Sequence, residues 1–552
     1  IIREVLSKEP VPFIYLRAGS RYKTIMIDEF QDTSLMQWLN LLPLIHESLA
    51  RGNTSWVVGD PKQSIYRWRN GKVEIMLGLP EIFEGSEDTM EAAGIIRSAF
   101  QKEDMEFNFR SDINIVDFNS KFYDYIKTRF IRSLSDEEVS DPIKNKLDIY
   151  AGVYDQIEQK PNAETAGFVE CRIYSGKLKD KKNQWLEDIV QVIRNCVDLK
   201  YNLSDIAILS RQNNIGVAIS SYLMSLEKPI PVISRETLQF RTSPHCLLAM
   251  CMYRLIHCPT DDLNATETWL LLQQYANINF ADDTEISNFL IQKKGVRGVM
   301  LLNYLTQKFE PLDPESLVFL PPVDQLDIII HSLGISDAGG FFLLFLREAI
   351  MKQQDNNGYN ADMLWQWWLE KGQTTSVIVP DAGDAVNIMT IHSSKGLQFP
   401  IVIIPYFNID ETKNIKRNLF WHPVDEEKWG IPYSVVNYTK DPPGDDLREQ
   451  YQLERTKSVM DTINLMYVGT TRAVEKLFMF SFLTPEKPVK ESSKSKKKEP
   501  EAPAETPLQT DSAKALRDFI RSGNISFSEE SHEHYTSWTF GEFPGKRKPK
   551  NK

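Results

Sequence analysis

Thr24–Ser34 reads TIMIDEFQDTS, and Ser55–Arg69 reads SWVVGDPKQSIYRWR. Each stretch is an apolar strand that ends abruptly in charged and polar residues, and in open α/β sheets ligands bind beyond the carboxyl ends of the strands. The first strand brings two adjacent carboxylates to that edge, and these suit a Mg²⁺–phosphate site. The second brings a glutamine followed by interleaved aromatic and basic residues, which suit single-stranded nucleic acid. Together the two stretches predict a motor that couples nucleotide hydrolysis to nucleic acid.

Length and composition indicate a globular protein of several domains. The chain has 552 residues, of which 42% are hydrophobic and 25% are charged, as is typical of soluble proteins with ample core. Its five cysteines form no CxxC pair, which favours a reducing cytoplasm over secretion. We expect no membrane span and find no signal-peptide pattern. The net charge of −12 gives no support to coating duplex DNA by charge alone, although a local basic groove would still bind nucleic acid.

The residue pattern changes character along the chain. Residues 1–106 alternate strand and helix, and a second α/β block occupies residues 107–260. Leu- and Trp-rich helical patterns dominate residues 261–375, which we interpret as a helical insertion. Strand signals return over residues 376–484. Residues 485–552 begin with Lys-rich and Pro/Ala/Thr-rich stretches that hold few apolar residues, so we expect a largely disordered tail.

Apolar runs predict the main secondary-structure elements. A long helix is expected around Arg455–Lys476, leading into a strand at Leu477–Ser481. An amphipathic helix is expected after Asp32, with Leu35, Trp38, Leu39, Leu42 and Ile45 on one face. Further strands are expected at Phe168–Tyr174, Ile206–Leu209, Ile230–Ile233, Val386–Thr390 and Ile401–Pro405.

Asp28 and Glu29 follow a run of apolar and β-branched residues, which is the Walker B arrangement. In such a site the first carboxylate holds Mg²⁺ through water, and the second orients the attacking water. The pattern alone is common, and a solvated strand end with an N-capping aspartate also fits it. The continuation Phe30-Gln31-Asp32-Thr33-Ser34 favours the nucleotide site.

The chain resembles superfamily-1 helicases of the UvrD/Rep/RecB type, whose motifs occur here in the family's order over about residues 20–480. The residues of the segments DEFQD, GDPKQ and NFRS resemble the RecB/AddA branch more closely than UvrD or Rep. That branch supplies the motor subunits of recombination helicase–nucleases. The similar segments are IDEFQDTS at 27–34 (motif II), VVGDPKQSIYRWR at 57–69 (motif III), FNFRS at 107–111 (motif IV), DIAILSR at 205–211 (a strand motif), VNIMTIHSSKGLQFPIVIIP at 386–405 (motif V) and INLMYVGTTRAVEKL at 463–477 (motif VI).

The resemblance implies a fold, an activity and partners. The fold would be α/β, with two RecA-like P-loop NTPase motor domains, the first incomplete and the second interrupted by the helical insertion. The activity would be that of an ATP-dependent DNA helicase that moves 3′ to 5′ on single-stranded DNA in repair or recombination. ATP and Mg²⁺ would bind between the motor domains. The partners would be single-stranded DNA or a junction of single- and double-stranded DNA, together with a second helicase–nuclease subunit.

The resemblance also assigns roles to individual residues. Asp28 and Glu29 would hold Mg²⁺ and the attacking water. Gln63 would contact the γ-phosphate or that water, and Arg110 and Arg472 would bind the γ-phosphate as the cleft closes. Tyr66 and Trp68 would stack on bases, although a lone tryptophan is more commonly core. The expected DNA contacts are Tyr66, Arg67, Trp68, Arg69, Thr390 and His392.

Two features depart from the family pattern. Gln398 stands where the family places a glutamate near the nucleotide ribose, so a neutral amide would make this nucleotide contact. No GxxxxGK[ST] phosphate loop occurs in the sequence. Gly19–Thr24 does not replace it, because it lacks the second glycine and runs straight into a strand. We therefore expect the chain to be truncated at its N-terminus, and to bind ATP poorly and hydrolyse it hardly at all as given.

Two other classes of function stay open. One is a DNA-binding or scaffold subunit of a helicase–nuclease complex without its own ATPase. The intact Asp28, Glu29, Gln63, Arg110 and Arg472 argue against it. The other is a non-motor P-loop enzyme such as a nucleotide kinase, which the aromatic and basic residues of motif III disfavour.

Two clusters are expected to be structural although their residue types suggest function. The His and Cys residues within 245–258 match no standard zinc or iron–sulfur spacing, and their apolar neighbours indicate a buried helix. Trp365, Trp367 and Trp368 are expected to fill the core of the insertion. The lysines of the tail are expected to form a solvated linker.

Overall fold

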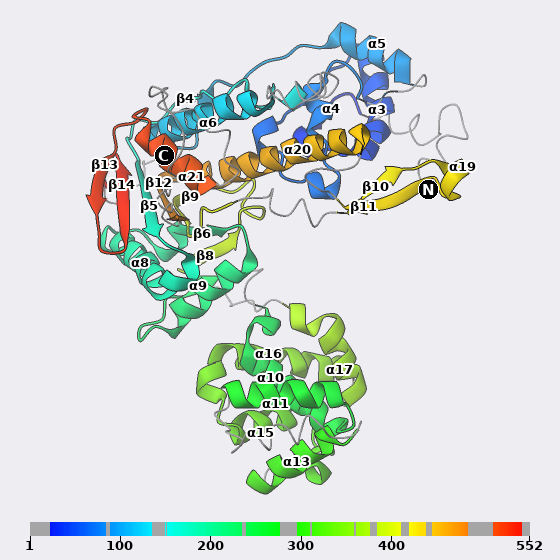
Figure 1. The fold of residues 1–552 in the computed structure, drawn as a ribbon, viewed down its shortest axis with the longest axis vertical. Coiled ribbons are helices and arrows are strands. Elements are labelled where there is room, and N and C mark those ends of the chain that lie inside the picture. Colours follow the sequence, from blue (N-terminus) through cyan, green and yellow to red (C-terminus); the bar gives the residue numbers. More distant parts are fainter. Residues whose placement is uncertain are drawn as a thin grey trace, which may run out of the picture. The chain divides into compact units, whose positions relative to one another are not determined.

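The computed structural model describes residues 22–83, 85, 89–134, 149–150, 152–234, 239–275, 295–309, 312–357, 360–375, 384–409, 419–437, 444–483 and 512–543. The chain forms two compact units, whose elements are labelled in Figure 1. The first unit comprises Ile1–Ile215 and Thr390–Lys552, and the second comprises Gly216–Met389. Every residue that the sequence assigns to a site lies in the first unit.

A small parallel sheet begins the described part of the first unit. Strand β1 (Ile25–Ile27) pairs with β2 (Ser55–Val57), and helix α3 (Leu35–Ala50) connects them. The helix begins with a capping box, in which Ser34 and Gln37 each accept the other's backbone N–H. Its buried residues are Trp38, Leu42, Ile45 and Ser48. The amphipathic helix expected after Asp32 is therefore confirmed, and because β1 and β2 are parallel their carboxyl ends lie at one edge.

Short helices follow the two strands. One 3-10 turn follows β1 and two follow β2, so both quoted stretches have a regular backbone beyond the strand ends. Helix α5 packs on α3 and closes this small core. These elements are η1 (Phe30–Asp32), η2 (Pro61–Gln63), η3 (Arg67–Arg69), α4 (Val73–Leu77) and α5 (Met90–Ala99).

A larger sheet forms the rest of the first unit. Its strands run in the order β13-β14-β5-β12-β9-β6, with β5, β12, β9 and β6 parallel and the β13–β14 hairpin antiparallel at the edge. Nearly every residue of β5, β6 and β12 is buried, as expected of parallel strands covered on both faces. Their bounds are β5 (Phe168–Ser175), β6 (Ile206–Ser210), β9 (Phe399–Ile404), β12 (Ala473–Leu483), β13 (Ser528–Ser531) and β14 (Tyr535–Phe540).

Helices cover this sheet. α6 packs against β5 and β12. α20 packs against β9 and against η2, the 3-10 turn that follows strand β2 of the small sheet. α8 buries an apolar face that includes Trp185, whose indole N–H donates to the carbonyl of Pro405 at 2.7 Å. The helices are α6 (Ile113–Leu134), α8 (Leu178–Asp198), α20 (Asp445–Thr470) and α21 (Ser512–Arg521), whereas most of α9 (Asn213–Ser225) belongs to the second unit.

The expected helix over Arg455–Lys476 is corrected by the structure. The helix starts earlier and ends at Thr470, and β12 begins at Ala473 rather than Leu477. The Thr471 hydroxyl donates to the carbonyl of Tyr467 at 2.6 Å, which supplies a side-chain donor at the helix end. The apolar run that starts at Ala473 then continues as a strand.

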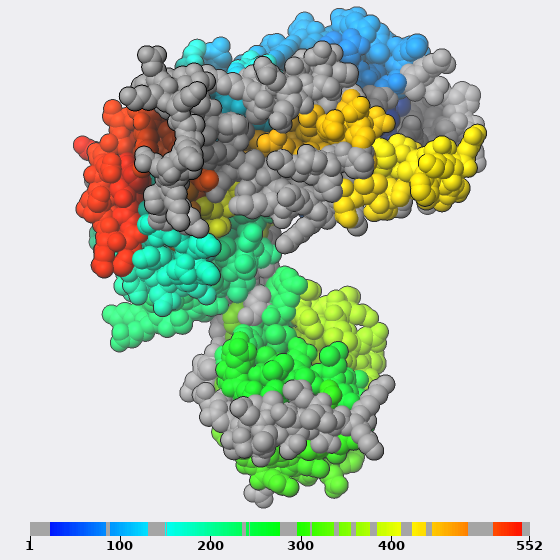
Figure 2. All heavy atoms as spheres, in the orientation of Figure 1, coloured from blue at the N-terminus to red at the C-terminus, as the bar shows by residue number. Residues whose placement is uncertain are grey.

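The C-terminal part also differs from expectation. Residues 485–552 were expected to be largely disordered, but residues 512–543 form α21 and the β13–β14 hairpin. Apolar residues recur every three or four positions in α21, and its buried face includes Leu516 and Phe519. In Figure 2 this red segment lies beside cyan surface of the first unit. Within the sheet, β14 pairs with β5. Residues 484–511 and 544–552, which contain the lysine-rich stretches, lie outside the described residues.

Smaller elements complete the described part of the first unit. β3 and β4 form a short parallel pair, and β10 and β11 form an antiparallel hairpin around α19. These elements are β3 (Phe107–Asn108), β4 (Lys160–Pro161), η5 (Gly152–Tyr154), η6 (Leu203–Asp205), β10 (Leu419–Pro423), α19 (Glu426–Trp429) and β11 (Tyr433–Asn437).

The second unit is mostly helical. Its two short strands, β7 (Val232–Ile233) and β8 (Val386–Thr390, which ends at the first residue of the other unit), are parallel. The unit extends beyond the 261–375 expected for the insertion and includes α10, whose Cys246 and Cys251 are buried as expected. Its other elements are η7 (Phe240–Thr242), α10 (Pro244–His257), α11 (Asp262–Tyr275), α13 (Arg297–Lys308), α14 (Pro314–Leu317), α15 (Pro322–Ser332), α16 (Ser336–Asn357), α17 (Ala361–Glu370) and η9 (Gly372–Thr374).

The tryptophans of α17 do not all share one environment. Trp368 is buried and lies 6.4 Å from Phe240, measured between ring centroids. Trp365 and Trp367 are half-buried. The core role expected for the three residues therefore holds fully for Trp368 alone.

Among the described residues, the helices are all too short or too polar to cross a membrane.

Candidate nucleotide and nucleic-acid site

The loops after β1 and β2 are held together by backbone and side-chain hydrogen bonds. Val58 N donates to the carbonyl of Ile27, and the buried Gln31 accepts from Asp60 N at 3.1 Å through Oε1. A Cβ on Gly59 would lie 2.4 Å from the same Gln31 oxygen, so a larger residue here would displace the Gln31 amide. The two quoted stretches therefore form one structural unit at the strand ends.

Both proposed Mg²⁺ carboxylates are exposed at this edge. Glu29 has a left-handed backbone with φ of 53°, and its N–H donates to Asp28 Oδ1 at 2.8 Å. A non-glycine residue in this region is strained, and such strain clusters at functional sites. Two adjacent carboxylates that solvent can reach offer the oxygen ligands that Mg²⁺ takes. The residues present therefore fit a hydrated Mg²⁺.

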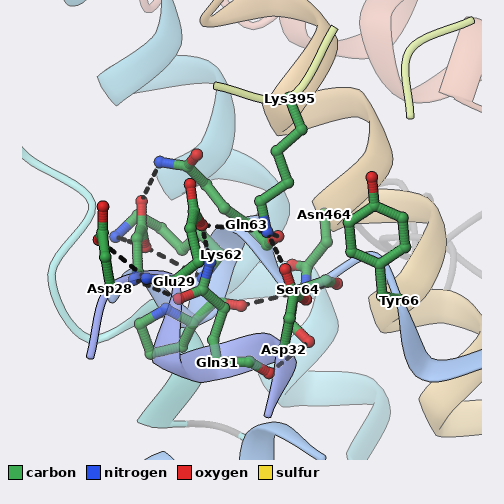
Figure 3. A network of polar contacts seen from close by, with 12 residues as sticks. Asp28, Glu29, Gln31, Asp32, Lys62, Gln63, Ser64, Tyr66, Lys395 and Asn464 are labelled. Carbon is green, nitrogen blue, oxygen red and sulfur yellow. Dashed lines mark hydrogen bonds and ion pairs between the residues drawn. The ribbon is translucent and has the colours of Figure 1, made fainter. Parts of the chain in front are cut away.

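A lysine that sequence analysis did not single out reaches these carboxylates. Lys395 Nζ forms an ion pair with Asp32, lies 3.2 Å from Glu29 Oε2, and donates to the carbonyl of Gln63 at 2.7 Å. Figure 3 shows its side chain descending between Gln63 and Tyr66 toward Asp32. Burial raises the pKa of Asp32, and the ammonium of Lys395 opposes this rise. The letters SSKG of motif V contain this lysine, but its partners could not be inferred from them.

The amide of Gln63 is oriented from both sides. Its Nε2 donates to Asp60 Oδ2 at 3.0 Å, and its Oε1 accepts from Arg472 at 3.3 Å. Lys62 in turn pairs with Asp60 at 2.8 Å and lies over the ring of Tyr467. The predicted γ-phosphate sensor is therefore in direct contact with one of the two predicted arginines.

The two arginines lie in a poorly hydrated region close to each other. Arg472 is fully buried and donates to the carbonyls of Val468 and Leu397. Burial, followed by the like charge of Arg110, lowers the pKa of Arg472 to about 10. Burial lowers the pKa of Arg110 as well. An anion placed beside both guanidinium groups would relieve this repulsion and desolvation.

Gln398 lies beside Arg110. Its Oε1 accepts from Arg110 Nε at 3.3 Å, while Arg110 also donates to the carbonyl of Thr471 at 3.3 Å. A neutral amide at this position accepts a hydrogen bond without cancelling the charge of the guanidinium. The structure thus places Gln398 with the arginines of the site.

The aromatic residues of motif III, with Arg69 and with His392 of motif V, form a partly exposed cluster, which we call the aromatic platform, made of Tyr66, Trp68, Arg69 and His392. Trp68 is 65% exposed, so the interpretation that it belongs to the core is wrong. Its ring lies 6.1 Å from that of Tyr66 and 6.4 Å from that of His392, and the guanidinium of Arg69 lies 4.6 Å over it. Rings beside a cation offer the stacking and charge that single-stranded nucleic acid requires.

Thr390 and Arg67 differ from the other predicted DNA contacts. Thr390 is buried, and its hydroxyl is 3.0 Å from that of Ser393. Arg67 donates twice to Glu454 at 2.9 Å and once to Asp461 at 2.7 Å. Although burial opposes it, the two carboxylates raise the pKa of Arg67 above its usual value. Arg67 therefore connects η3 to α20, a role that the sequence analysis missed.

Asn464 makes a second connection between motif III and α20. The residue is fully buried, and its Nδ2 donates to the carbonyls of Pro61 and Ser64 at 3.2 and 2.9 Å. Its Oδ1 accepts from the hydroxyl of Tyr154 at 2.8 Å. The segment that carries Gln63 is thus fixed to the helix that ends two residues before Arg472.

Comparisons with known proteins agree with this arrangement. Residues 5–84 match the model of the UvrD/REP helicase N-terminal domain, and residues 104–310 and 342–484 match that of the UvrD-like helicase C-terminal domain. The chain is similar to an ATP-dependent helicase/nuclease subunit from Limosilactobacillus fermentum, with 24% identity covering 84% of this chain and 41% of that protein.

A second relative shows a similar identity and a similar coverage. The exonuclease/helicase subunit RexA of Lactococcus lactis subsp. cremoris is 23% identical, over 86% of this chain and 42% of its own length. The chain therefore spans about two fifths of the length of these curated relatives. The α/β fold class and the resemblance to the RecB/AddA branch are confirmed by these matches.

Proposed function

Because the chain belongs to the UvrD-like helicase family, we propose that it is the motor part of an ATP-dependent DNA helicase that acts in DNA repair or recombination. ATP with Mg²⁺ is its cofactor, single-stranded DNA or a junction with duplex is its track, and 3′ to 5′ is its direction. Its relatives are named as helicase/nuclease subunits, which supports a partner that is a second helicase–nuclease subunit.

One observation carries this proposal: the segment after β2 contacts both halves of the site. Gln63 is hydrogen-bonded to Arg472, and a few residues later the half-buried Tyr66 and the exposed Trp68 lie together in the aromatic platform. Nucleotide-sensing and DNA-stacking groups on one short segment are what a motor that couples the two needs.

The chemistry follows from the positions of the side chains. Mg²⁺ bound at Asp28 and Glu29 would neutralise charge on the phosphates. Glu29 orients the attacking water, and the side-chain amide of Gln63 contacts the γ-phosphate or that water. Arg110 and Arg472 donate to the γ-phosphate, where negative charge accumulates during transfer. Gln398 holds Arg110 in place while leaving its charge available to the phosphate.

We further propose that these 552 residues alone hydrolyse ATP weakly, because no GxxxxGK[ST] loop is among them. Robust ATPase turnover by this chain in the presence of single-stranded DNA would contradict that statement.

The proposed function is tested on the full-length protein by ATP hydrolysis with and without single-stranded DNA. We expect DNA to stimulate hydrolysis, and Glu29→Gln to lower kcat by about 10²–10⁴-fold while DNA binding persists. Trp68→Ala should weaken single-stranded DNA binding by about 1–3 kcal/mol. Trp429→Ala, which removes an exposed tryptophan of α19, is the matched control.

Two outcomes would contradict the proposal, and each would support a different function. DNA binding without any hydrolysis would instead support a DNA-binding or scaffold subunit. Hydrolysis that single-stranded DNA does not stimulate would indicate a non-motor P-loop enzyme.

A further inference from the structure

The hairpin of β10 and β11, drawn in yellow in Figure 1, presents hydrophobic side chains to solvent. The solvent-facing positions of a surface strand are normally polar. Along β11 exposed and half-buried residues alternate, and the exposed positions include Tyr433 and Val435, which are 55% and 47% exposed. Just before the strand, Ile431 and Trp429 are 49% and 64% exposed. We call these four residues the apolar hairpin surface.

The outer edge of β11 is open in the part of the chain that the structure describes. Its sheet contains β10 and β11 alone. Val424 N donates to the carbonyl of the opposite residue Pro432 at 3.1 Å. Hydrogen-bonded and non-hydrogen-bonded pairs alternate in an antiparallel ladder, so Tyr433 and Val435 direct their backbone N–H and C=O groups away from β10. A row of such groups can pair with a further strand.

Two other strand edges are protected where this one is not. On β10, the residue opposite Tyr433 is Pro423, which offers no N–H to a further strand. At the edge of the large sheet, β13 has the sequence Ser-Glu-Glu-Ser, and all four residues are exposed. Charged side chains and prolines are the usual protection of an edge strand. Tyr433 and Val435 carry neither a charge nor a proline ring.

The charges beside the apolar hairpin surface indicate the class of partner. α19, which connects the two strands, exposes the carboxylates of Asp425, Glu426 and Glu427 but has a single lysine, Lys428. These carboxylates would repel the phosphates of nucleic acid. A second copy of the hairpin would add three more carboxylates and one lysine without complementing them. A strand with apolar and basic side chains complements both the surface and its charge.

We propose that the outer edge of β11 docks an extended segment of a different protein, which pairs with Tyr433 and Val435 as an additional β-strand. The apolar side chains of that segment pack on the apolar hairpin surface, and a lysine or arginine faces α19. Backbone hydrogen bonds provide the affinity of such pairing, and side chains provide its specificity. This role is additional to the function proposed above, because no residue assigned to the nucleotide or nucleic-acid site lies in β10, α19 or β11.

The test uses the full-length protein and two short fluorescein-labelled peptides. In the first peptide valine alternates with lysine and threonine, and in the second glutamate replaces lysine. Fluorescence anisotropy gives the Kd of each peptide. We expect the lysine peptide to bind at least about threefold more tightly than the glutamate peptide, because only the lysine peptide complements the carboxylates of α19. Its binding should also slow hydrogen exchange in residues 431–437.

Two variants of β11 test the edge itself. Val435→Pro removes an N–H that points away from β10, so the ladder of the hairpin is kept while the edge is blocked. It should raise the Kd of the lysine peptide about tenfold. Tyr433→Lys leaves the backbone unchanged and places a positive charge on the surface, and it should raise this Kd about fivefold or more. If Val435→Pro disrupts the hairpin, Tyr433→Lys carries the test.

The matched control is Glu529→Pro on β13. His532 N donates to the carbonyl of Tyr535 at 2.9 Å, so the same alternation directs the N–H of Glu529 away from β14. This variant blocks an exposed edge that carries no apolar side chain, and it should leave the Kd of both peptides unchanged.

Each contrary result overturns the inference. These results are a wild type that binds neither peptide, equal Kd values for the two peptides, and wild-type peptide binding in both β11 variants. A dimer of the full-length protein that Val435→Pro dissociates would assign the edge to a second copy instead. Loss of oligothymidylate binding in Val435→Pro would assign the hairpin to nucleic acid. The ATPase assay with single-stranded DNA decides the proposed function separately.

Discussion

Arg67 and Arg69 are two residues apart in motif III, yet their surroundings differ. Arg67 is directed into α20, where its guanidinium bonds Glu454 and Asp461. Arg69 is exposed and lies over the rings of Tyr66 and Trp68. Composition alone treats the two arginines alike, whereas in the structure one is paired with carboxylates of α20 and the other is exposed beside aromatic rings.

Arg67→Ala is expected to lower the free energy of unfolding by about 1–3 kcal/mol, because it leaves two partly buried carboxylates without their shared cation. Arg69→Ala should leave stability within about 0.5 kcal/mol of the wild type. It should instead weaken single-stranded DNA binding by about 0.5–2 kcal/mol, since it removes a cation from the aromatic platform. Chemical denaturation and fluorescence anisotropy measure the two effects.

Each arginine serves as the control for the other. Equal losses of DNA affinity in folded Arg67→Ala and Arg69→Ala proteins would show that Arg67 contacts DNA after all. A wild-type stability for Arg67→Ala would remove its role at α20.

At the scale of elements, helix α10 of the second unit shows that a local sequence pattern can predict a buried helix. The buried helix expected near residue 250 is α10, and apolar residues surround its cysteines. The helix ends at His257, whose Nε2 lies 2.8 Å from Gln325 Oε1 on α15. Burial lowers the pKa of His257, although Gln325 and Asp362 oppose the shift and Arg254 adds to it.

This lowered pKa predicts the direction of the pH dependence of stability. The folded state binds a proton at His257 less readily than the unfolded state does, so the unfolded state holds more protons as pH falls through about 6.5. The free energy of unfolding should therefore decrease on acidification from about pH 7.5 to about pH 5.5. His257→Asn should flatten this dependence, as measured by denaturant unfolding at each pH.

The control for this prediction is His331→Asn, at an exposed position of α15 in the same unit. It should keep the wild-type pH dependence, because it leaves His257 and its contact with Gln325 unchanged. An unchanged slope in His257→Asn would show that the acid sensitivity arises elsewhere.

The elements that sequence predicted best carry their signal locally. The strands at Phe168–Tyr174 and Val386–Thr390 were placed to within a residue, because each is a short run rich in β-branched and aromatic residues. The site contacts that were missed join distant segments. Lys395 and Asp32 are 363 residues apart, and Arg67 and Asp461 are 394 apart. Such pairs depend on how the chain folds back on itself, which neither spacing nor periodicity contains.

At the scale of the whole molecule, the described C-terminal segment is an integral part of the first unit. β14 adds an antiparallel edge to β5, and α21 packs on α6. Phe519 is fully buried, with ring centroids 5.9 Å from Phe118 and 5.2 Å from Phe122. The lysine- and proline-rich composition just before α21 concealed this amphipathic helix from the sequence analysis.

Phe519→Ala is therefore expected to destabilise the protein by about 3–5 kcal/mol, because it removes a large buried side chain and leaves a cavity among aromatic rings. Phe319→Ala makes the same chemical change at a side chain that is 87% exposed, and it should stay within about 0.5 kcal/mol of the wild type. Equilibrium unfolding followed by tryptophan fluorescence measures both. If the two variants were equally stable, α21 would contribute nothing to the core of the first unit. If only Phe519→Ala is destabilised, the segment that composition marks as a tail is a structural part of the first unit.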